Sequence, residues 1–347
     1  MKRRRFLETS AAASALAALA PAVISRARAG DAPDVEGAKK EGQVSWYTAH
    51  FDTQTAEGVG NAFMKKYPGI KANVFRSTAQ VVYQRLSQDM RAGVAECDVF
   101  SSTDVGHYIH LKPSGVFLEW TPPNAANVAP AFKGLDPDGQ YYVTSVGLIC
   151  ITYNKSKVKE SEVPKSWPEL TDPKWKDQVS VGHPGFSGYV GTWVVEMRKL
   201  YGWQYFEKLK AINPQIGRSI NDTVTMLNSG ERTIAAGPEA TTLESAAKGN
   251  PLGVVYPSDG SLLMVSPSAI MKNSKHPNAA KLFMDFLMGP ETSEVYVEYF
   301  QAPILPGIKP AAGAKPISEV KTIRPTIDEI TTGIPEVIKQ WRDTFGV

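Results

Sequence analysis

The chain has 347 residues, of which 42% are hydrophobic, 10% aromatic and 21% charged. This balance is typical of a folded globular protein and excludes a disordered, collagenous or coiled-coil chain. The length predicts two domains, each large enough to bury its own core.

The first 29 residues have the pattern of a secretory signal peptide. A basic start is followed by a short Ala/Leu-rich run over 11–24, which is too short to span a membrane. Small residues at Ala27 and Ala29 predict cleavage near Ala29, and Arg3-Arg4-Arg5-Phe6-Leu7 resembles the twin-arginine export signal. A basic leader of the general export pathway is the alternative. Either way, we expect a periplasmic protein.

The leader also explains the formal net charge of +3. It holds six basic residues against one acidic residue, which is more than the whole basic surplus, so the mature chain has a small net negative charge. We find no basic stripe with interleaved aromatic residues elsewhere, and we therefore expect no nucleic-acid partner.

Cys97 and Cys150 each lie in an apolar, strand-like run. We interpret them as buried free thiols, although an exported protein could also form a disulfide. Two cysteines so far apart make no metal motif, and we expect no cofactor.

Strands and helices alternate along the first third of the mature chain, which indicates a parallel sheet with crossover helices. The expected strands are 43–47, 70–75 and 97–100, and the expected helices are 53–67 and 79–91. The alternation resumes after residue 147, with strands at 148–153, 178–181 and 233–236 and helices at 166–170, 189–201 and 221–227.

The pattern predicts an α/β protein with two lobes, each a mostly parallel sheet flanked by helices. Two apolar segments, 142–153 and 260–271, are expected to cross between the lobes as hinges. Lobe 1 would contain 30–146 and 261–300, the latter including helices at 276–288 and 291–300, and lobe 2 would contain 147–260. The remainder, 301–347, is expected to form a surface wrap and a helix at 335–345, on a lobe that the sequence leaves open.

Polar residues gather where the predicted strands end. Ligands of open α/β sheets bind at that edge, beside helix N-termini that carry unpaired N–H groups. The same side chains could simply cap helices, but several of them meeting in one cleft would form a ligand site. The candidate ligand-binding residues are Thr48, His50, Arg76, Ser77, Thr78, Ser101, Ser102, Thr103, Ser145, Ser187, Asn221 and Glu239.

No sequence motif supports catalysis. The chain lacks a Gly-x-Ser-x-Gly elbow, a His-Glu-x-x-His zinc motif, a dinucleotide fingerprint and a Walker loop, so we do not expect an enzyme. His107 and His110 are spaced i, i+3 on an expected helix, and we interpret them as part of a solvated helix face rather than a metal site.

Several motifs resemble those of periplasmic substrate-binding proteins of ABC importers, in the family-1 extracellular solute-binding group. They are Trp46-Tyr47-Thr48, Cys97-Asp98-Val99-Phe100, Trp167-Pro168-Glu169-Leu170, Asn221 to Glu231 and His276-Pro277-Asn278-Ala279-Ala280. The resemblance implies a type II two-lobe binding fold, a small-molecule ligand and an ABC permease partner in the inner membrane. We expect the protein to act as a monomer.

The ligand is less well defined by the resemblance. Ferric binders of this group carry two adjacent tyrosines where this chain has Pro238-Glu239, which argues against iron, although His50, Asp52 and Glu239 leave a metal set open. Polyamine binding would need stacking aromatic residues beside carboxylates such as Asp104, Asp259 and Glu239.

A small organic anion or zwitterion, such as a phosphonate, phosphate ester or carboxylate, fits best. Arg76 and the neighbouring hydroxyl groups would hold the anion, and Glu239 would face an ammonium or hydroxyl group. A ligand sensor or an enzyme on the same fold is the remaining alternative.

Overall fold

The computed structural model describes residues 31–347. The predicted signal peptide and its twin-arginine motif therefore lie outside the described residues. Within these residues the chain forms eleven α-helices around one ten-stranded sheet, and no helix is long and apolar enough to cross a membrane.

The strands are β1 (Gln43–Thr48), β2 (Lys71–Arg76), β3 (Val99–Ser101), β4 (Tyr141–Asn154), β5 (Val179–Gly182), β6 (Gln215–Gly217), β7 (Ile234–Pro238), β8 (Leu252–Val255), β9 (Ser261–Ile270) and β10 (Thr322–Ile323). The α-helices are α1 (Val35–Glu41), α2 (Thr53–Lys66), α3 (Ala79–Arg91), α4 (Gly106–Leu111), α5 (Gly188–Tyr201), α6 (Gln204–Ala211), α7 (Asp222–Ser229), α8 (Glu239–Ala247), α9 (Pro277–Phe286), α10 (Pro290–Glu298) and α11 (Ile327–Phe345).

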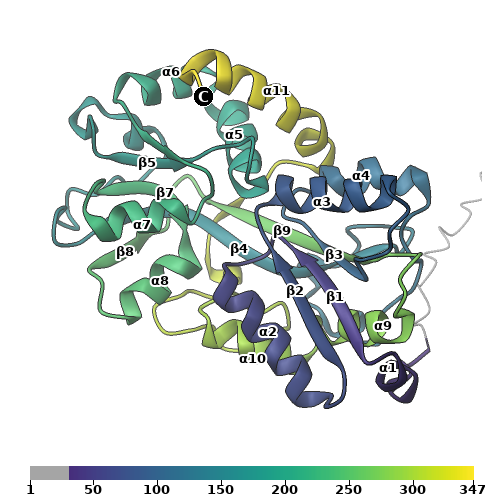
Figure 1. Ribbon diagram of the computed structural model, residues 1–347. Coiled ribbons are helices and arrows are strands. Elements are labelled where there is room, and N and C mark those ends of the chain that lie inside the picture. Colours follow the sequence, from purple (N-terminus) through teal and green to yellow (C-terminus); the bar gives the residue numbers. More distant parts are fainter. Residues whose placement is uncertain (1–30) are drawn as a thin grey trace, which may run out of the picture.

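The sheet has a parallel group of three strands at each end of its path. Its order is β2-β1-β3-β9-β4-β7-β5-β6, with β10 beside β9 and β8 beside β4. β1 pairs in parallel with β2 and β3, and β5 pairs in parallel with β6 and β7. We call the half around β1–β3 lobe 1 and the half around β5–β7 lobe 2 (Figure 1). This arrangement confirms the predicted two-lobe α/β fold.

Two long antiparallel strands connect the lobes. β4 and β9 pair from Tyr141 opposite Ala269 to Ile149 opposite Leu262, and they coincide with the two segments predicted to cross. The register shifts between Val143 and Ser145, so Thr144 sits at a bulge. Bulges bend and twist a strand locally, which suits a connection between two bodies.

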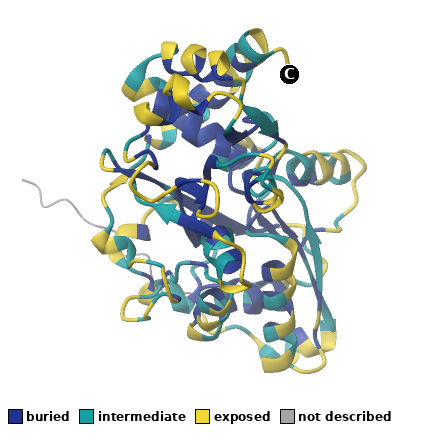
Figure 2. Ribbon diagram, turned by 90° about the vertical axis from the view of Figure 1, so that its left-hand side faces the viewer, coloured by how far each residue is buried: buried dark blue, intermediate teal, exposed yellow. Residues whose placement is uncertain are grey.

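Lobe 1 has a hydrophobic core on each face of its sheet, because successive residues of a strand point to opposite faces. Trp46 packs with residues of α2 and α9, including Phe63 and Phe283, whereas the next residue, Tyr47, packs with α3 and α4 on the other face. Across the molecule, buried residues lie on the central strands and exposed residues on the outer helices and loops (Figure 2).

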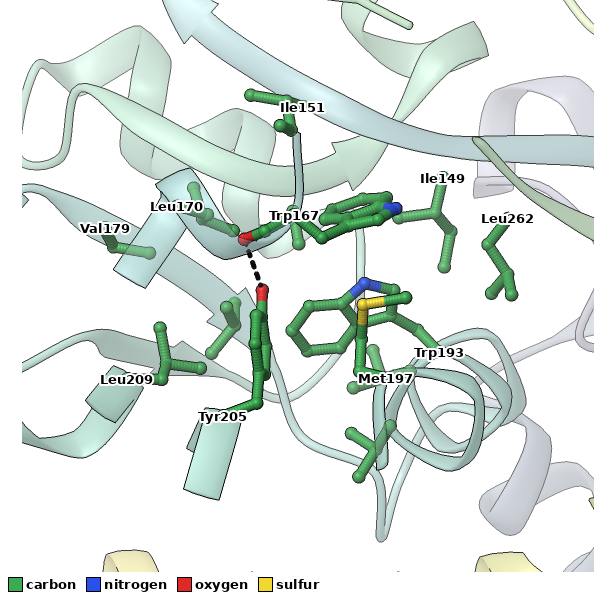
Figure 3. Close-up of a cluster of buried hydrophobic side chains, with 14 of the residues drawn as sticks. Ile149, Ile151, Trp167, Leu170, Val179, Trp193, Met197, Tyr205, Leu209 and Leu262 are labelled. Atoms are coloured by element: carbon green, nitrogen blue, oxygen red, sulfur yellow. Dashed lines mark hydrogen bonds between the residues drawn. The ribbon is translucent and has the colours of Figure 1, made fainter. Parts of the chain in front are cut away.

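The core of lobe 2 is built around tryptophans. The rings of Trp167 and Trp193 lie 5.8 Å apart, and the Tyr205 hydroxyl donates a hydrogen bond to the Trp167 carbonyl over 3.1 Å (Figure 3). Trp341 of α11 is fully buried in the same cluster.

The C-terminal helix belongs with lobe 2, a placement that the sequence left open. α11 packs mainly against α5 and also against α6, as Figure 1 shows, and it touches α4 of lobe 1; α10 packs against α2 and α9 of lobe 1. The predicted start at residue 335 was wrong. A capping box between Thr326 and Glu329 begins the helix earlier, and Pro335 lies inside it.

The predicted residue boundaries of the lobes stay predictions.

The helix predicted at 166–170 is instead a 3-10 turn, Pro168–Thr171, because the segment is too short to hold α-helical hydrogen bonds of its own.

Candidate functional site

A small cavity of about 50 Å³ lies between the two lobes. Residues of both lobes line it: Ala49, Phe51, Arg76, Thr78, Ala79 and Thr103 from lobe 1, and Gly147, Leu148, Ser187, Tyr189, Ser219, Ile220, Asn221, Pro238, Ala240 and Thr241 from β4 and lobe 2, with Gln301 from the segment after α10.

Four helices begin at the wall of this cavity. The residues that precede their first turns, Thr78 of α3, Ser187 of α5, Asn221 of α7 and Pro238 of α8, all line it. The N-terminus of a helix carries a partial positive charge and unpaired N–H groups. Four such ends around one small space favour a bound anion.

Among the residues that the structure describes, Arg76 is the one charged residue in the lining. Its guanidinium donates to the Phe51 carbonyl, but its Nε is buried and has no hydrogen-bond partner. Burial lowers the pKa of Arg76, while the carboxylates of Asp52 and Asp222 act in the opposite direction. Because a half-buried cation with no carboxylate in hydrogen-bond contact is costly, a negative group beside Arg76 would be stabilised.

The loop after β1 is held in a strained conformation beside Arg76. Phe51 has a φ of 63°, which is uncommon for a residue other than glycine. Its ring packs 5.0 Å from the ring of Tyr296, and its carbonyl accepts the bond from Arg76. Strained loops of this kind concentrate at ligand sites, where the surrounding contacts hold them.

The hydroxyl groups of the two lobes differ in how they are used. Thr78 Oγ1 is buried without a partner, although it precedes α3. Ser187 Oγ accepts from the Val190 N–H at 3.5 Å, and Thr241 Oγ1 donates to Asn221 Oδ1 over 3.2 Å. Thr78 Oγ1 therefore keeps an unused hydrogen-bonding capacity, whereas the lobe 2 groups already have partners.

The structure brings together five of the sequence-predicted site residues. Arg76, Thr78, Thr103, Ser187 and Asn221 line the cavity, and the other seven lie outside its lining. Thr48 is buried and accepts from the His50 N–H at 3.0 Å, and the Ser77 N–H donates to the Thr48 carbonyl over 3.1 Å.

Three further serines are buried in the interior. Ser101 Oγ accepts from Trp46 Nε1 at 2.7 Å, and Ser102 Oγ lies 2.8 Å from His107 Nδ1. Ser145 is a buried residue of β4. These residues follow or lie within strands, as predicted, but none of the three belongs to the cavity lining.

His50 is also buried behind the cavity. Burial lowers its pKa to about 3, even though the backbone of Ser102 and Pro267 favours the charged form. Neither ring nitrogen makes a close hydrogen bond. The ring is therefore neutral at ordinary pH and contributes no charge to a ligand.

Glu239 faces the C-terminal segment instead of the cavity. Its carboxylate accepts a hydrogen bond from the Tyr256 hydroxyl, which in turn accepts from the Lys315 N–H at 3.1 Å. Burial raises the pKa of Glu239. The expectation that Glu239 faces a ligand ammonium group is therefore not met by this geometry.

The alternative metal set is not assembled. Asp52 caps α2 by accepting from the Thr55 N–H at 2.7 Å, His50 is buried and Glu239 is bonded to Tyr256. Across residues 31–347, no group of three His, Cys, Asp or Glu residues is placed to hold a metal ion.

The prediction that His107 lies on a solvated helix face was wrong. His107 is buried, its ring is stacked 4.1 Å from that of Tyr83, and its Nε2 lies 3.4 Å from the Asp104 carboxylate. Cys97 and Cys150 are both buried and unpaired, which confirms the interpretation of free thiols.

Sequence reasoning missed part of the cavity wall. Tyr189 lies in the first turn of α5, and its hydroxyl is so close to Gly147 that a Cβ there would be 2.7 Å away. Thr241 lies in the first turn of α8, and it was not predicted because it does not directly follow a strand. Gln301 comes from a segment far away in sequence, and no local signal marks it.

Comparison with known proteins agrees with this architecture. A family model described as bacterial extracellular solute-binding protein matches residues 97–331. An uncharacterized protein of Haemophilus influenzae is 28% identical over 164 residues, which span 45% of this chain and 47% of that relative's length. The iron uptake protein A1 of Synechocystis is 23% identical, with 89% of each chain covered. A putative 2-aminoethylphosphonate-binding periplasmic protein of Salmonella paratyphi A is 21% identical over 87% of this chain and 88% of its own.

Solved structures show the same fold. The periplasmic binding protein AfuA from Actinobacillus pleuropneumoniae, with fructose 6-phosphate bound, has a TM-score of 0.79 and 20% identity over 88% of this chain and 99% of its own. Iron-bound HitA from Pseudomonas aeruginosa has a TM-score of 0.74 and 22% identity over 87% of this chain and 99% of its own. The chain therefore belongs to the bacterial extracellular solute-binding protein family, the substrate-binding components of ABC importers with the two-lobe periplasmic binding fold.

Proposed function

We propose that this protein binds a small anion, such as a phosphonate, phosphate ester or carboxylate, and delivers it to an ABC permease in the inner membrane. The observation that carries the proposal is the cavity lining, in which a half-buried arginine is the sole charge among the described residues and four helix N-termini converge.

The same lining disfavours the other ligands carried by relatives. It contains no carboxylate, histidine or cysteine among the described residues, so it offers no counter-charge to a polyamine. Tyr189 supplies one phenol, whereas the ferric binders that the sequence resembles use an adjacent pair. Because Glu239 lies outside the lining, a simple anion fits better than a zwitterion.

Capture follows from the placement of these groups on two lobes. An anion held by Arg76 and Thr78 of lobe 1 would also meet the helix starts at Ser187 and Asn221 of lobe 2. Since these contacts can all form only when the lobes are together, the ligand shifts the equilibrium toward the closed form.

Thermal unfolding against single compounds tests the proposal. The panel contains inorganic phosphate, ethylphosphonate, 2-aminoethylphosphonate, fructose 6-phosphate, citrate, spermidine and ferric chloride. A compound at 100 times its dissociation constant adds about 2.7 kcal/mol to the free energy of unfolding and raises the midpoint visibly.

We expect a shift with at least one anion and no shift with spermidine. Ethylphosphonate should be at least as effective as 2-aminoethylphosphonate, because no carboxylate lines the cavity to pair with the amine. A shift with spermidine or ferric chloride alone would overturn the proposal. Arg76→Gln is the matched control, and it should abolish any anion-dependent shift.

A further inference from the structure

The first turn of α5 in lobe 2 touches the loop after β3 in lobe 1 without an intervening side chain. A Cβ placed on Gly188 would lie 2.6 Å from the carbonyl carbon and oxygen of Thr103 and from the nitrogen of Asp104. All three are main-chain atoms, which cannot rotate away as the end of a side chain can. Real Cβ atoms keep well beyond this distance, so the contact as it stands requires glycine.

The backbone of Gly188 gives no other reason for glycine. It begins a 14-residue α-helix and does not adopt a left-handed conformation. Alanine is the better residue within a helix, so the fold of lobe 2 alone would accept it. The demand for glycine comes from the other lobe.

The contact borders the ligand cavity. Ser187, directly before Gly188, and Thr103, on the opposite side of the contact, both line the cavity. The separation of the lobes at this point therefore fixes how far apart two walls of the site stand.

We propose that Gly188 sets the distance to which the lobes close, and that any side chain at position 188 acts as a wedge between them. Gly188 is thus a positioning residue, because it brings Ser187 and Thr103 to the same ligand without touching the ligand itself. The proposal rests on the solute-binding role of the family and not on the charge of the ligand.

A second contact between the lobes offers a way to measure closure. A Cβ on Gly106 of α4 would lie 3.7 Å from the Cα of Thr331 in α11, which packs with lobe 2. Since a Cβ lies about 1.5 Å from its own Cα, the two Cα atoms are at most about 5.2 Å apart, and cysteines with Cα atoms about 4.4–6.8 Å apart can form a disulfide. Gly106→Cys with Thr331→Cys should therefore cross-link only when the lobes are together. The native thiols at Cys97 and Cys150 are buried and should not compete.

The experiment compares three full-length mature proteins that all carry this cysteine pair: one with no further change, one with Gly188→Ala and one with Gly191→Ala. The readout is the rate of disulfide formation at a fixed oxidant concentration, without any ligand. Gly191 is the matched control in the same helix, because a Cβ there would meet the side chain of Ile334 within lobe 2, at 3.1 Å.

We expect Gly188→Ala to slow cross-linking by roughly tenfold or more, since a closed state raised in free energy is populated less. Gly191→Ala should cross-link at the parent rate. Equal rates for Gly188→Ala and the parent would overturn the proposal.

Thermal unfolding separates an effect of Gly188→Ala on lobe closure from an effect on the stability of the fold. With the cysteines reduced, Gly188→Ala should unfold at or above the parent temperature, because the lobes are free to separate. With the disulfide formed beforehand, the same substitution should lower the unfolding temperature, and a missing difference between the two redox states would contradict the wedge. Neither measurement uses a ligand, so each outcome is independent of whether the bound solute is an anion.

Discussion

The two sides of the cavity are prepared differently for a ligand. Lobe 1 presents groups without partners, namely Arg76 Nε and Thr78 Oγ1, whereas the lobe 2 groups Ser187 and Asn221 are already hydrogen-bonded within their own lobe. Unpaired buried groups gain most from a new partner. We infer that lobe 1 supplies most of the ligand's binding energy and that lobe 2 mainly encloses it.

Loss of the charge in lobe 1 should have the largest effect. Arg76→Gln removes the one charged partner in the lining, and a hydrogen bond to a charged group contributes about 3 kcal/mol at most, or roughly 150-fold in Kd. Calorimetry with the anion that gives the largest thermal shift measures this loss. The affinity of Arg76→Lys should fall between those of the parent and of Arg76→Gln, since lysine keeps the charge but not the planar donor geometry. Equal affinity in all three proteins would remove Arg76 from the site.

Acid should weaken the protein through the loop of lobe 1. Burial lowers the pKa of His50 to about 3, whereas an exposed histidine titrates near 6.5. The unfolded state therefore binds more protons between these values, and the stability present above pH 6.5 is lost as the pH falls toward 3. Near pH 4.5 we expect a loss of about 2–3 kcal/mol from this residue.

Urea denaturation of the parent and of His50→Asn at pH 7 and pH 4.5 measures that contribution. The variant should lose less stability between the two pH values than the parent does. If both proteins lost the same amount, His50 would not be the group that titrates.

Smaller effects should separate the hydroxyl groups of the two lobes. Thr78→Val should lower anion affinity by about 1 kcal/mol and leave stability nearly unchanged, because the hydroxyl has no partner to lose. Ser187→Ala should lower stability by about 0.5–1 kcal/mol, through loss of the α5 cap, and change affinity less. Calorimetry and thermal unfolding of both variants test this difference between the lobes. A larger loss of affinity in Ser187→Ala than in Thr78→Val would contradict it.

The sequence predicted the fold well because strand and helix periodicity reflects local burial. The alternation of strands and helices located β1–β3 and β5–β7, and the two long apolar runs located β4 and β9. The start of α11 was missed because Pro335 resembles a first helical residue, while the decisive signal was the capping box at Thr326 and Glu329.

Five of the predicted site residues line the cavity, and their position in the chain explains why. Arg76, Thr78, Thr103, Ser187 and Asn221 follow strands at the edge where helices begin. Their neighbours Ser101 and Ser102 share that position, yet they lie outside the lining. Ser101 is hydrogen-bonded to Trp46, which is distant in sequence, and Ser102 to His107 of α4.

Glu239 and Gln301 show the other limit of sequence reasoning. Whether Glu239 faces the ligand depends on Tyr256, and the placement of Gln301 depends on where the chain after α10 returns to the cavity. Both are tertiary contacts that no local pattern encodes.

The order in which the chain visits the lobes has a consequence for its biosynthesis. Lobe 1 takes β1–β3 from early in the chain but needs β9 and α9, and lobe 2 takes its sheet from the middle but needs α11, whose Trp341 completes its core. β9 and α9 follow the strands of lobe 2 in the chain, and α11 follows the last helices of lobe 1. Each lobe can therefore complete its core only after much of the other lobe has been synthesised.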